Sequence, residues 1–291
     1  MGKHIKFYLP GLRKRLEDRG DLPEMPIRSV DSLNRKLWGI QRGKFYVVAA
    51  RTSNGKSAFV LQIAADIASQ GHPVLYLSLE MDTIALLERM FCQVCKVPNM
   101  DLLHGRIGDY EKDWKEFSMI SEKIEIVITD SIGKTWEEID THINKLAMKP
   151  KVIIIDHIHE IKKSDSKERE MIDEYIRRFK EMAIRHNFAG IICAQINRTG
   201  QNEKDKRPYL HQIKSSGYLE EAADFGILLH YPFQLRLSTD QNKFDVFVDK
   251  NRNGRTGHIP LYFEPSTYSF KDVKPETNQK VNKAVGVDLN D

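Results

Sequence analysis

The chain has 291 residues, of which 41% are apolar and 30% are charged, and its formal net charge is +4. These values predict an ordinary globular protein with a sizeable core, arranged as one large domain or two small ones. The small positive excess permits a nucleic-acid partner without requiring one. Because the sequence lacks an 18-residue apolar run and an apolar signal region at its start, we expect no membrane partner and a cytoplasmic location.

Three cysteines are present. Cys92 and Cys95 form a single C-x-x-C in a helix-like segment, and Cys193 lies in a strand-like run. No second Cys or His pair stands at the spacing of a zinc site. We therefore interpret the thiols as small buried apolar groups.

The first 28 residues are charged and interrupted by prolines. They contain one short helical candidate, Pro10–Arg19, and we expect an arm or linker there. From residue 29 to residue 273, strand-like and helix-like segments alternate, which is typical of an α/β domain with a mainly parallel sheet flanked by helices. The strands predicted for this sheet are Phe45–Ala50, Val74–Leu79, Ile124–Thr129, Val152–Ile155, Gly190–Ala194 and Gly226–His230.

The pattern changes towards the end of the chain. Phe244–Lys250 and His258–Phe263 flank the pair Asn253-Gly254, which is a strong hairpin signal although the connection is longer than two residues. We therefore predict a C-terminal antiparallel hairpin. Residues 274–291 are polar and carry no core pattern, so we expect a disordered tail.

Residues 50–57 stand between a predicted strand and an apolar-striped helix. A loop in this position directs backbone N–H groups and the positive end of the helix at one place, where polyphosphate fits. We therefore predict a P-loop that binds ATP with Mg²⁺. Lys56 reaches the β- and γ-phosphates, and the Ser57 hydroxyl holds the metal. The first glycine of the usual pattern is replaced by Ala50. The predicted nucleotide-binding residues of the loop are Ala50, Arg51, Thr52, Ser53, Asn54, Gly55, Lys56 and Ser57.

Three other predicted strands end near polar side chains that suit nucleotide chemistry. Asp156 ends one apolar run and, beside a phosphate loop, would hold Mg²⁺ or its water shell. Glu80 follows another run and could orient the attacking water and accept its proton, although strand-end glutamates are also common caps. Gln195 could sense the γ-phosphate and pass its presence to the following loop, and a capping or turn role is equally compatible with the sequence.

Together these motifs resemble the motor domain of DnaB-type replicative helicases, a RecA-like ATPase family. Order and spacing agree from about Pro26 to Phe270. The family tolerates alanine at position 50. The resemblance implies a RecA-like fold, ATP with Mg²⁺ as cofactors, and a homo-oligomeric ring, a hexamer by family likeness. The segments that carry it are Ala49–Ser57, Ser78–Met81, Ile155–Asp156, Ala194–Arg198, Ser216–Asp224 and Lys250–Gly254.

The resemblance also implies roles for individual residues. Glu80 matches the catalytic base, and Arg89, nine residues further on, matches an arginine that contacts the nucleotide. Lys250 and Arg252 match finger residues supplied to the ATP of a neighbouring subunit. From the sequence alone, these last two are charges near a hairpin tip, which are usually only solvated.

Two segments match family loops that meet single-stranded DNA. Arg198–Arg207 corresponds to a loop facing the central channel, and Lys214 to Gly217 to phosphate-binding positions. The family usually has Arg then Glu where this chain has Lys214 then Ser215, and lysine still neutralises phosphate as a point charge. A first channel loop, Lys162–Arg169, is less typical because its charges are mixed. The alternative for each segment is a solvated charged turn. The predicted DNA-binding residues are Arg198, Lys204, Lys206, Arg207, Lys214, Ser215 and Gly217.

His157 and His159 directly follow Asp156, where many relatives carry an aromatic residue and a glutamine. A metal site needs more ligands than this alternating pair supplies. We interpret the two histidines as polar packing or as a relay of the nucleotide state.

DnaB-type helicases usually carry a helical N-terminal collar domain that meets primase, and only residues 1–28 precede the motor in this sequence. The resemblance therefore leaves primase binding open and suggests a phage or mobile-element source. Pro10–Arg19 could be a linker helix that docks on the next subunit through Leu12 and Leu16, one turn apart. A frayed arm is the alternative.

The leading hypothesis is a ring-forming, ATP-driven translocase on single-stranded DNA that acts as a replicative-type helicase. A helicase loader or other replication proteins would be further partners. One alternative is a RecA- or KaiC-like ATPase without unwinding activity, and another is a regulatory protein that co-assembles with a host helicase. The placement of Glu80, Lys250 and Arg252 favours the first hypothesis.

Overall fold

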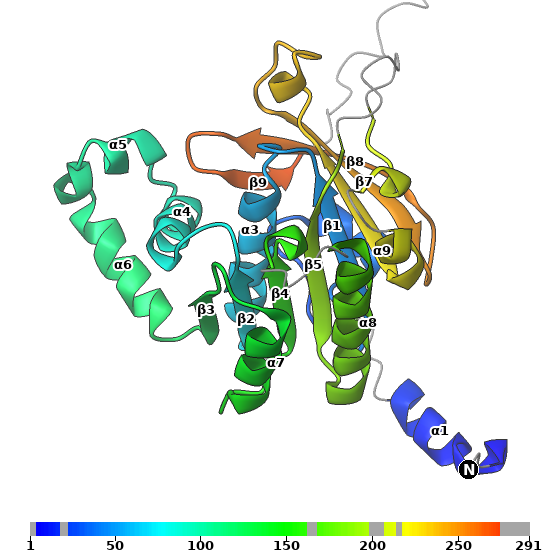
Figure 1. Ribbon diagram of the computed structural model, residues 1–291. Helices are drawn as coiled ribbons and strands as arrows, with labels where there is room; N and C mark the ends of the chain where they lie inside the picture. Colours follow the sequence, from blue (N-terminus) through cyan, green and yellow to red (C-terminus); the bar gives the residue numbers. More distant parts are fainter. Residues whose placement is uncertain (1–3, 18–22, 162–167, 198–206, 214–216, 274–291) are drawn as a thin grey trace, which may run out of the picture.

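The computed structural model describes residues 4–17, 23–161, 168–197, 207–213 and 217–273 (Figure 1). Within these ranges one sheet runs through the protein. Its strands are β1 (Phe45–Ala50), β2 (Val74–Ser78), β3 (Ile126–Asp130), β4 (Val152–Asp156), β5 (Ala189–Gln195), β6 (Phe225–His230), β7 (Lys243–Asn251), β8 (Gly257–Glu264) and β9 (Ser269–Asp272).

The strands lie side by side in the order β3-β2-β4-β5-β1-β6-β7-β8-β9. Neighbours from β3 to β6 pair in parallel, and β7, β8 and β9 extend the sheet in antiparallel. A parallel pair needs a crossover connection, and the alternating helices of the sequence supply it. The predicted mainly parallel sheet is therefore confirmed.

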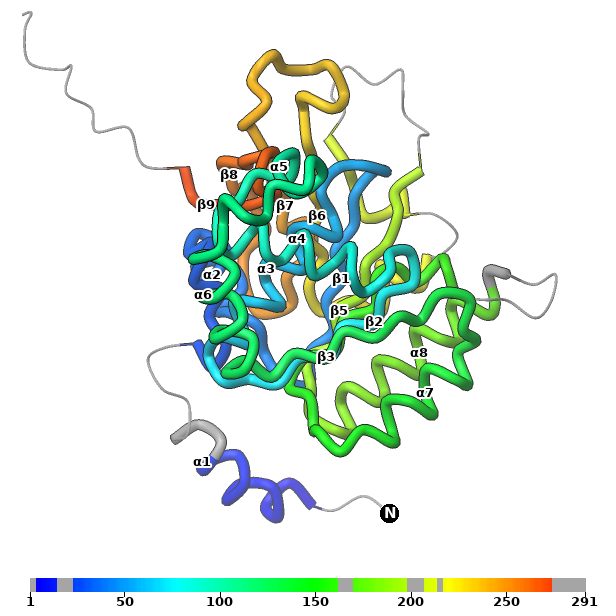
Figure 2. The backbone as a smooth tube through the Cα atoms, turned by 90° about the vertical axis from the view of Figure 1, so that its left-hand side faces the viewer, coloured from blue at the N-terminus to red at the C-terminus, as the bar shows by residue number. Residues whose placement is uncertain are grey.

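Helices cover both faces of the sheet (Figures 1 and 2). α2, α3, α4 and α6 contribute to the core on one face, and α7, α8 and α9 to the core on the other. The helices are α1 (Leu9–Glu17), α2 (Asp31–Leu37), α3 (Lys56–Ala68), α4 (Thr83–Cys95), α5 (Asn99–Leu103), α6 (Glu111–Ser121), α7 (Trp136–Lys145), α8 (Glu168–His186) and α9 (Gly217–Ala222).

The central strands are apolar on both sides because both faces are covered. In β1, Tyr46 and Val48 belong to the core under α3, whereas Phe45 and Val47 belong to the core under α8. All six residues of β1 are buried. The continuous apolar run that predicted this strand is thus the signature of its central place in the sheet.

Most predicted strands match the observed ones closely. β3 begins two residues later than predicted, at Ile126, and β2 ends at Ser78. The C-terminal hairpin is confirmed as β7 and β8, joined by residues 252–256. The short strand β9 was missed, since Phe270 is its only large apolar residue. The predicted tail, residues 274–291, lies outside the described residues.

The N-terminal segment contains α1, which stands away from the sheet in both views (Figures 1 and 2). Leu9 and Leu12 on this helix are about half exposed. The expectation that residues 1–28 form an arm, separate from a motor of residues 29–273, stays a prediction. None of the helices in the described ranges is long and apolar enough to cross a bilayer.

The predicted burial of the thiols is confirmed for two of the three cysteines. Cys92 and Cys193 are buried, and Cys95 is half-buried. Burial raises the pKa of the Cys92 thiol to about 11, so this group stays protonated at neutral pH.

Close packing between α8 and β5 leads to a stability prediction. A Cβ added to Gly190 would stand 2.9 Å from Cε1 of Phe179, a ring that is fully buried. We expect Gly190→Ala to lower the free energy of unfolding by about 1–3 kcal/mol, because the packed ring has no room to move. Urea unfolding measures this difference.

A matched control is Gly108→Ala, where an added Cβ meets nothing within 4 Å. We expect a change of no more than about 0.5 kcal/mol there. Equal unfolding midpoints for the two variants would contradict the packing argument.

Candidate nucleotide site

The carboxyl ends of four neighbouring strands meet along one side of the sheet, which we call the nucleotide edge. β4 lies between β2 and β5, and β5 lies next to β1. The register places Ser78 opposite Asp156, and Ala50 opposite Gln195. Ligands of parallel α/β sheets bind outside the carboxyl ends of the strands. The sheet therefore brings the predicted loop, the Asp156 carboxylate, Glu80 and Gln195 to a common edge.

The phosphate loop connects β1 to α3 in a fixed shape. Ser53 and Gly55 both have a left-handed backbone, with φ of 61° and 73°. Gly55 precedes the first residue of α3 and provides no side chain to cap the helix. The N–H groups of the first helical turn are therefore left for an anion, and the helix dipole favours negative charge there.

Asn54 holds this loop from inside. Its side chain is 1% exposed. Its Oδ1 accepts a hydrogen bond from the Tyr231 N–H at 3.0 Å, and its Nδ2 donates to the Thr52 carbonyl at 3.0 Å. The amide thus ties the loop to the end of β6. Gly55 packs on the other side, where an added Cβ would lie 3.3 Å from the Phe270 ring.

Lys56 and Asp156 face each other at the centre of the site. The Lys56 Nζ lies 3.8 Å from the Asp156 Oδ1, and the two side chains are 11% and 3% exposed. The Tyr76 hydroxyl donates to the Asp156 Oδ2 at 2.7 Å. Burial and the Asp156 charge raise the pKa of Tyr76 well above its ordinary value, so the phenol remains a donor.

The Asp156 Oδ1 is buried and has no hydrogen-bond partner among the described residues. A buried carboxylate oxygen is costly unless a cation or a hydrogen-bond donor compensates it, and the Lys56 ammonium at 3.8 Å stands beyond hydrogen-bond distance. Oxygen ligands are those that Mg²⁺ prefers. The Asp156 oxygen therefore suits a magnesium ion at this edge, and Ser57 follows Lys56 in the first turn of α3.

Glu80 lies two residues beyond β2 on a well-fixed backbone. The Leu79 N–H donates to the Asp156 carbonyl at 2.7 Å, and the Met81 N–H to the Ser78 Oγ at 3.2 Å. The Glu80 side chain itself is 54% exposed. It is thus available to a water molecule at the edge of the site.

Gln195 contacts the phosphate loop directly. Its Nε2 donates to the Thr52 Oγ1, and the next residue, Ile196, donates its N–H to the Ala50 carbonyl at 2.9 Å. The end of β5 is therefore linked to the loop before the chain enters residues 198–206. This geometry is suited to the sensing role that the sequence left open.

Arg89 lies on α4, which is tied to the start of α3. The Gln93 Nε2 donates to the Ala58 carbonyl in the first turns of α3 at 2.7 Å and to the Tyr268 carbonyl at 2.8 Å. The Arg89 guanidinium stacks over the Tyr268 ring at 4.9 Å. Its Nε is buried and has no hydrogen-bond partner in the described part of the chain.

Two contributors to the site were missed from the sequence. Tyr76 supports Asp156, and Tyr268, with a φ of 55°, supports Arg89. A signal existed for Tyr76, since a tyrosine inside a buried strand needs a partner for its hydroxyl. No comparable signal marked Tyr268, because its role depends on contact with a distant helix.

Lys250 and Arg252 lie at the opposite edge of the sheet. Lys250 pairs with Gly226 near the start of β6, whereas the phosphate loop follows the end of the parallel strand β1. The Lys250 Nζ donates to the carbonyls of Glu220 and Glu221, and the Arg252 Nη2 donates to the latter at 3.1 Å. The structure therefore does not bring this pair to the phosphate loop of its own chain.

The charge of Arg252 is also balanced within the chain. Its Nη1 lies 3.4 Å from the Oδ1 of the buried Asp224, and the Asp224 Oδ2 accepts the Phe45 N–H at 3.0 Å. Burial, followed by the charge of Arg252, lowers the pKa of Lys250. Both side chains are held in place before any ligand arrives.

Only part of the predicted DNA-binding set can be placed. Arg207 packs over the Phe247 ring at 4.5 Å and pairs with Asp249 at 3.1 Å, so its guanidinium already has partners within the chain. Gly217 is exposed at the start of α9. The other predicted residues lie outside the described ones: Arg198, Lys204, Lys206, Lys214 and Ser215. Most of the first channel-loop candidate, residues 162–167, does so too.

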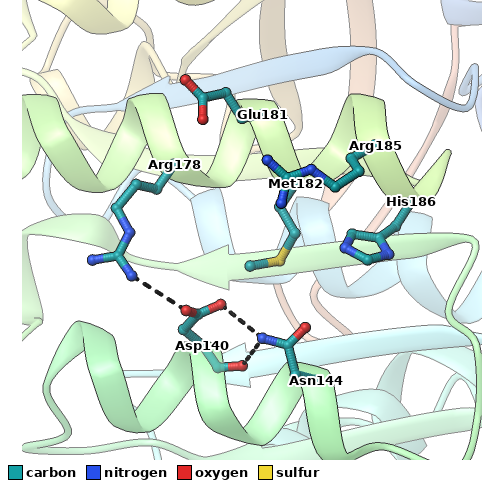
Figure 3. A pocket seen from close by; sticks show the side chains of 7 residues that line it. All are labelled: Asp140, Asn144, Arg178, Glu181, Met182, Arg185 and His186. Carbon is teal, nitrogen blue, oxygen red and sulfur yellow. Dashed lines mark hydrogen bonds and ion pairs between the residues drawn. The ribbon is translucent and has the colours of Figure 1, made fainter.

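A hollow of about 230 Å³ lies elsewhere, between α7 and α8 (Figure 3). Arg178 and Asp140 line it and pair with each other at 3.2 Å. None of its lining residues belongs to the phosphate loop. Its mixed charges do not suit polyphosphate, and it plays no part in the nucleotide site.

Residues 28–272 match the family described as the DnaB-like helicase C terminal domain. The chain belongs to this family. Its fold is that of the RecA-like ATPase motor, and the DnaB-type resemblance inferred from the motifs is confirmed.

Curated relatives include the replicative DNA helicase DnaC of Bacillus subtilis (strain 168), 30% identical over 267 residues, which are 88% of this chain and 58% of that protein. The replicative DNA helicase DnaB of Geobacillus stearothermophilus is 29% identical over 241 residues, covering 79% of this chain and 53% of that one. The chain thus spans little more than half the length of these relatives.

Solved structures agree with this assignment. A DnaB-like replicative helicase, described with its interactions with primase, superposes with a TM-score of 0.81 and 25% identity, over 93% of this chain and 69% of that one. A second solved structure, of an isolated ATPase domain, superposes with a TM-score of 0.82 over 94% of this chain and 100% of that domain. Its identity of 24% supports the fold alone.

The role of Asn54 in shaping the loop can be tested by substitution. Asn54→Ala would leave the buried Tyr231 N–H without its acceptor, so we expect a loss of about 1–3 kcal/mol in the free energy of unfolding. Asn54→Asp keeps an acceptor for that N–H but buries a charge and sets a carboxylate oxygen against the Thr52 carbonyl, so we expect a loss at least as large. Chemical unfolding measures both variants, and a loss below about 0.5 kcal/mol for Asn54→Ala would refute this role.

Proposed function

We propose that the chain is the motor of a ring-forming ATPase that moves along single-stranded DNA and acts as a replicative-type helicase. One observation carries the proposal. The groups suited to bind and attack ATP lie at one edge of the sheet, and the Lys250/Arg252 pair lies at the opposite edge. If that pair acts on ATP, it therefore acts on the ATP of a neighbouring copy.

Each residue at the nucleotide edge has a role in this function. Loop N–H groups and Lys56 bind the phosphates, and Ser57 and Asp156 would hold Mg²⁺, which neutralises charge on the β- and γ-phosphate oxygens. Glu80 orients the attacking water and takes its proton. Arg89 contacts the nucleotide.

The signal from ATP can leave the site through Gln195. Its amide contacts the phosphate loop through Thr52, and the chain then enters residues 198–206 within three residues. We assign to that stretch, and to the segment from Lys214 to Gly217, contacts with DNA phosphates. Such contacts are tolerant of sequence and sensitive to salt.

The ring requires contact between copies. Lys250 and Arg252 would supply positive charge to the ATP of the next subunit, and a finger of this kind is worth ~10³–10⁵ in rate. We propose a hexamer, in the cytoplasm, with α1 docking on the neighbour through Leu12 and Leu16. A loader or other replication proteins would be further partners.

Two other functions remain distinguishable by experiment. A RecA- or KaiC-like ATPase would hydrolyse ATP without opening duplex DNA, and a regulatory partner of a host helicase would show no hydrolysis stimulated by single-stranded DNA. Unwinding of a forked duplex, with the particle mass measured in the presence of an ATP analogue and an oligonucleotide, separates all three.

Two substitutions test the catalytic assignment. We expect Lys56→Ala and Glu80→Gln each to reduce DNA-stimulated ATP hydrolysis at least ~100-fold, because one removes a phosphate-binding charge and the other a general base. Fluorescent ATP should still bind to Glu80→Gln and should bind poorly to Lys56→Ala.

The control is Glu88→Gln, which changes an exposed carboxylate on α4. This variant should hydrolyse ATP at the wild-type rate. Full activity of Glu80→Gln would remove the base from the proposed mechanism.

Mixed rings test whether the finger acts on a neighbour. We expect Arg252→Ala alone to lower hydrolysis by about 10³. Mixing it with Glu80→Gln should restore part of the activity, because an intact base then meets an intact finger at some interfaces. Arg255→Ala, in the same turn, serves as the control at wild-type rate. Absence of any recovery would show that Arg252 acts within one chain or not at all.

A further inference from the structure

One buried imidazole stands beside the carboxylate that we propose as the base. His157 directly follows β4, and its side chain is 6% exposed. Its Nε2 lies 3.4 Å from the Glu80 Oε2. Since β2 and β4 are neighbours in register, this contact joins the ends of two adjacent strands at the nucleotide edge.

Glu80 needs support of this kind. Its backbone is fixed by the Leu79 and Met81 hydrogen bonds, but its side chain is 54% exposed. An exposed glutamate samples several rotamers, and ordering it costs side-chain entropy. A general base must lie within hydrogen-bond reach of the attacking water, and small displacements lower the rate steeply. A ring fixed by burial is a firmer anchor than a second exposed side chain.

We propose that His157 is a positioning residue that holds Glu80 in its catalytic orientation. The imidazole Nε2 engages one carboxylate oxygen and leaves the other to the water. This inference rests on the proposed function, because it presupposes that Glu80 is the base. His157 would act only through Glu80 and would not touch the reacting atoms.

A second carboxylate competes for the same nitrogen. Glu160, in the short 3-10 helix η3 (Ile158–Glu160), has its Oε1 3.6 Å from the His157 Nε2 and is 51% exposed. One ring nitrogen donates one hydrogen bond at a time. Glu160 therefore competes with Glu80 for this nitrogen, and its removal should not slow hydrolysis. This makes Glu160→Gln a matched control, since it removes a negative charge that faces the same imidazole ring.

The test compares His157→Ala, His157→Gln and Glu160→Gln in the full chain, with ATP, Mg²⁺ and single-stranded DNA. We expect His157→Ala to lower kcat about 10-fold and to leave the KM for ATP within about twofold, because ground-state binding is unaffected. His157→Gln should recover much of the rate, since its amide N–H can engage the same oxygen. Glu160→Gln should keep kcat within about twofold of wild type.

A double variant separates positioning from a merely structural role. If His157 acts through Glu80, then Glu80→Gln/His157→Ala should hydrolyse ATP no more slowly than Glu80→Gln alone. An additive loss in the double variant would overturn the inference. So would a kcat of His157→Ala within about twofold of wild type, or a joint loss of ATP affinity and thermal stability that His157→Gln does not restore.

The outcomes also separate this inference from the proposed function. If Glu80→Gln hydrolyses ATP at the wild-type rate, the assignment of the base fails, and the role of His157 fails with it. If Glu80→Gln is inactive and His157→Ala is unimpaired, only the role of His157 is lost.

Discussion

The nucleotide edge depends on a buried carboxylate that the chain leaves half satisfied. Asp156 receives one hydrogen bond from Tyr76 and faces the Lys56 ammonium across 3.8 Å. A buried ion pair is weak evidence for stability, because desolvation offsets the attraction between the charges. The placement of Lys56 and Asp156 is therefore better explained by ligand binding than by a contribution to the stability of the fold. In the proposed function, phosphates would become the partner of the Lys56 ammonium, and a metal ion would become the partner of the Asp156 carboxylate.

Much of this arrangement could be predicted from the sequence. Strands β1, β2 and β4 are buried on both faces, so each appears as an uninterrupted apolar run that ends next to polar residues. Parallel pairing then places those ends together, which is why the sequence alone could assign Lys56, Glu80 and Asp156 to one site. The hairpin was equally visible, since Asn253-Gly254 encodes its turn locally.

What could not be predicted depends on contacts between distant segments. Thr52 and Gln195 are 143 positions apart in the chain, yet their side chains touch at the phosphate loop. The Arg89–Tyr268 stack joins a helix to a turn at the far end of the chain. Arg207 looked like one more cation of a DNA loop, yet it packs against aromatic rings and pairs with Asp249. Periodicity and spacing carry no information about such neighbours.

The anchoring of Lys250 and Arg252 on α9 has a mechanical meaning. Both cations are fastened to backbone carbonyls at the last turn of a six-residue helix, and Lys180 is fastened to the next carbonyl, that of Ala222. Because both cations are bonded to the same turn of α9, a shift of that helix would move them together. That helix begins at Gly217, so a displacement of its first turn would be carried along α9 to both cations at once.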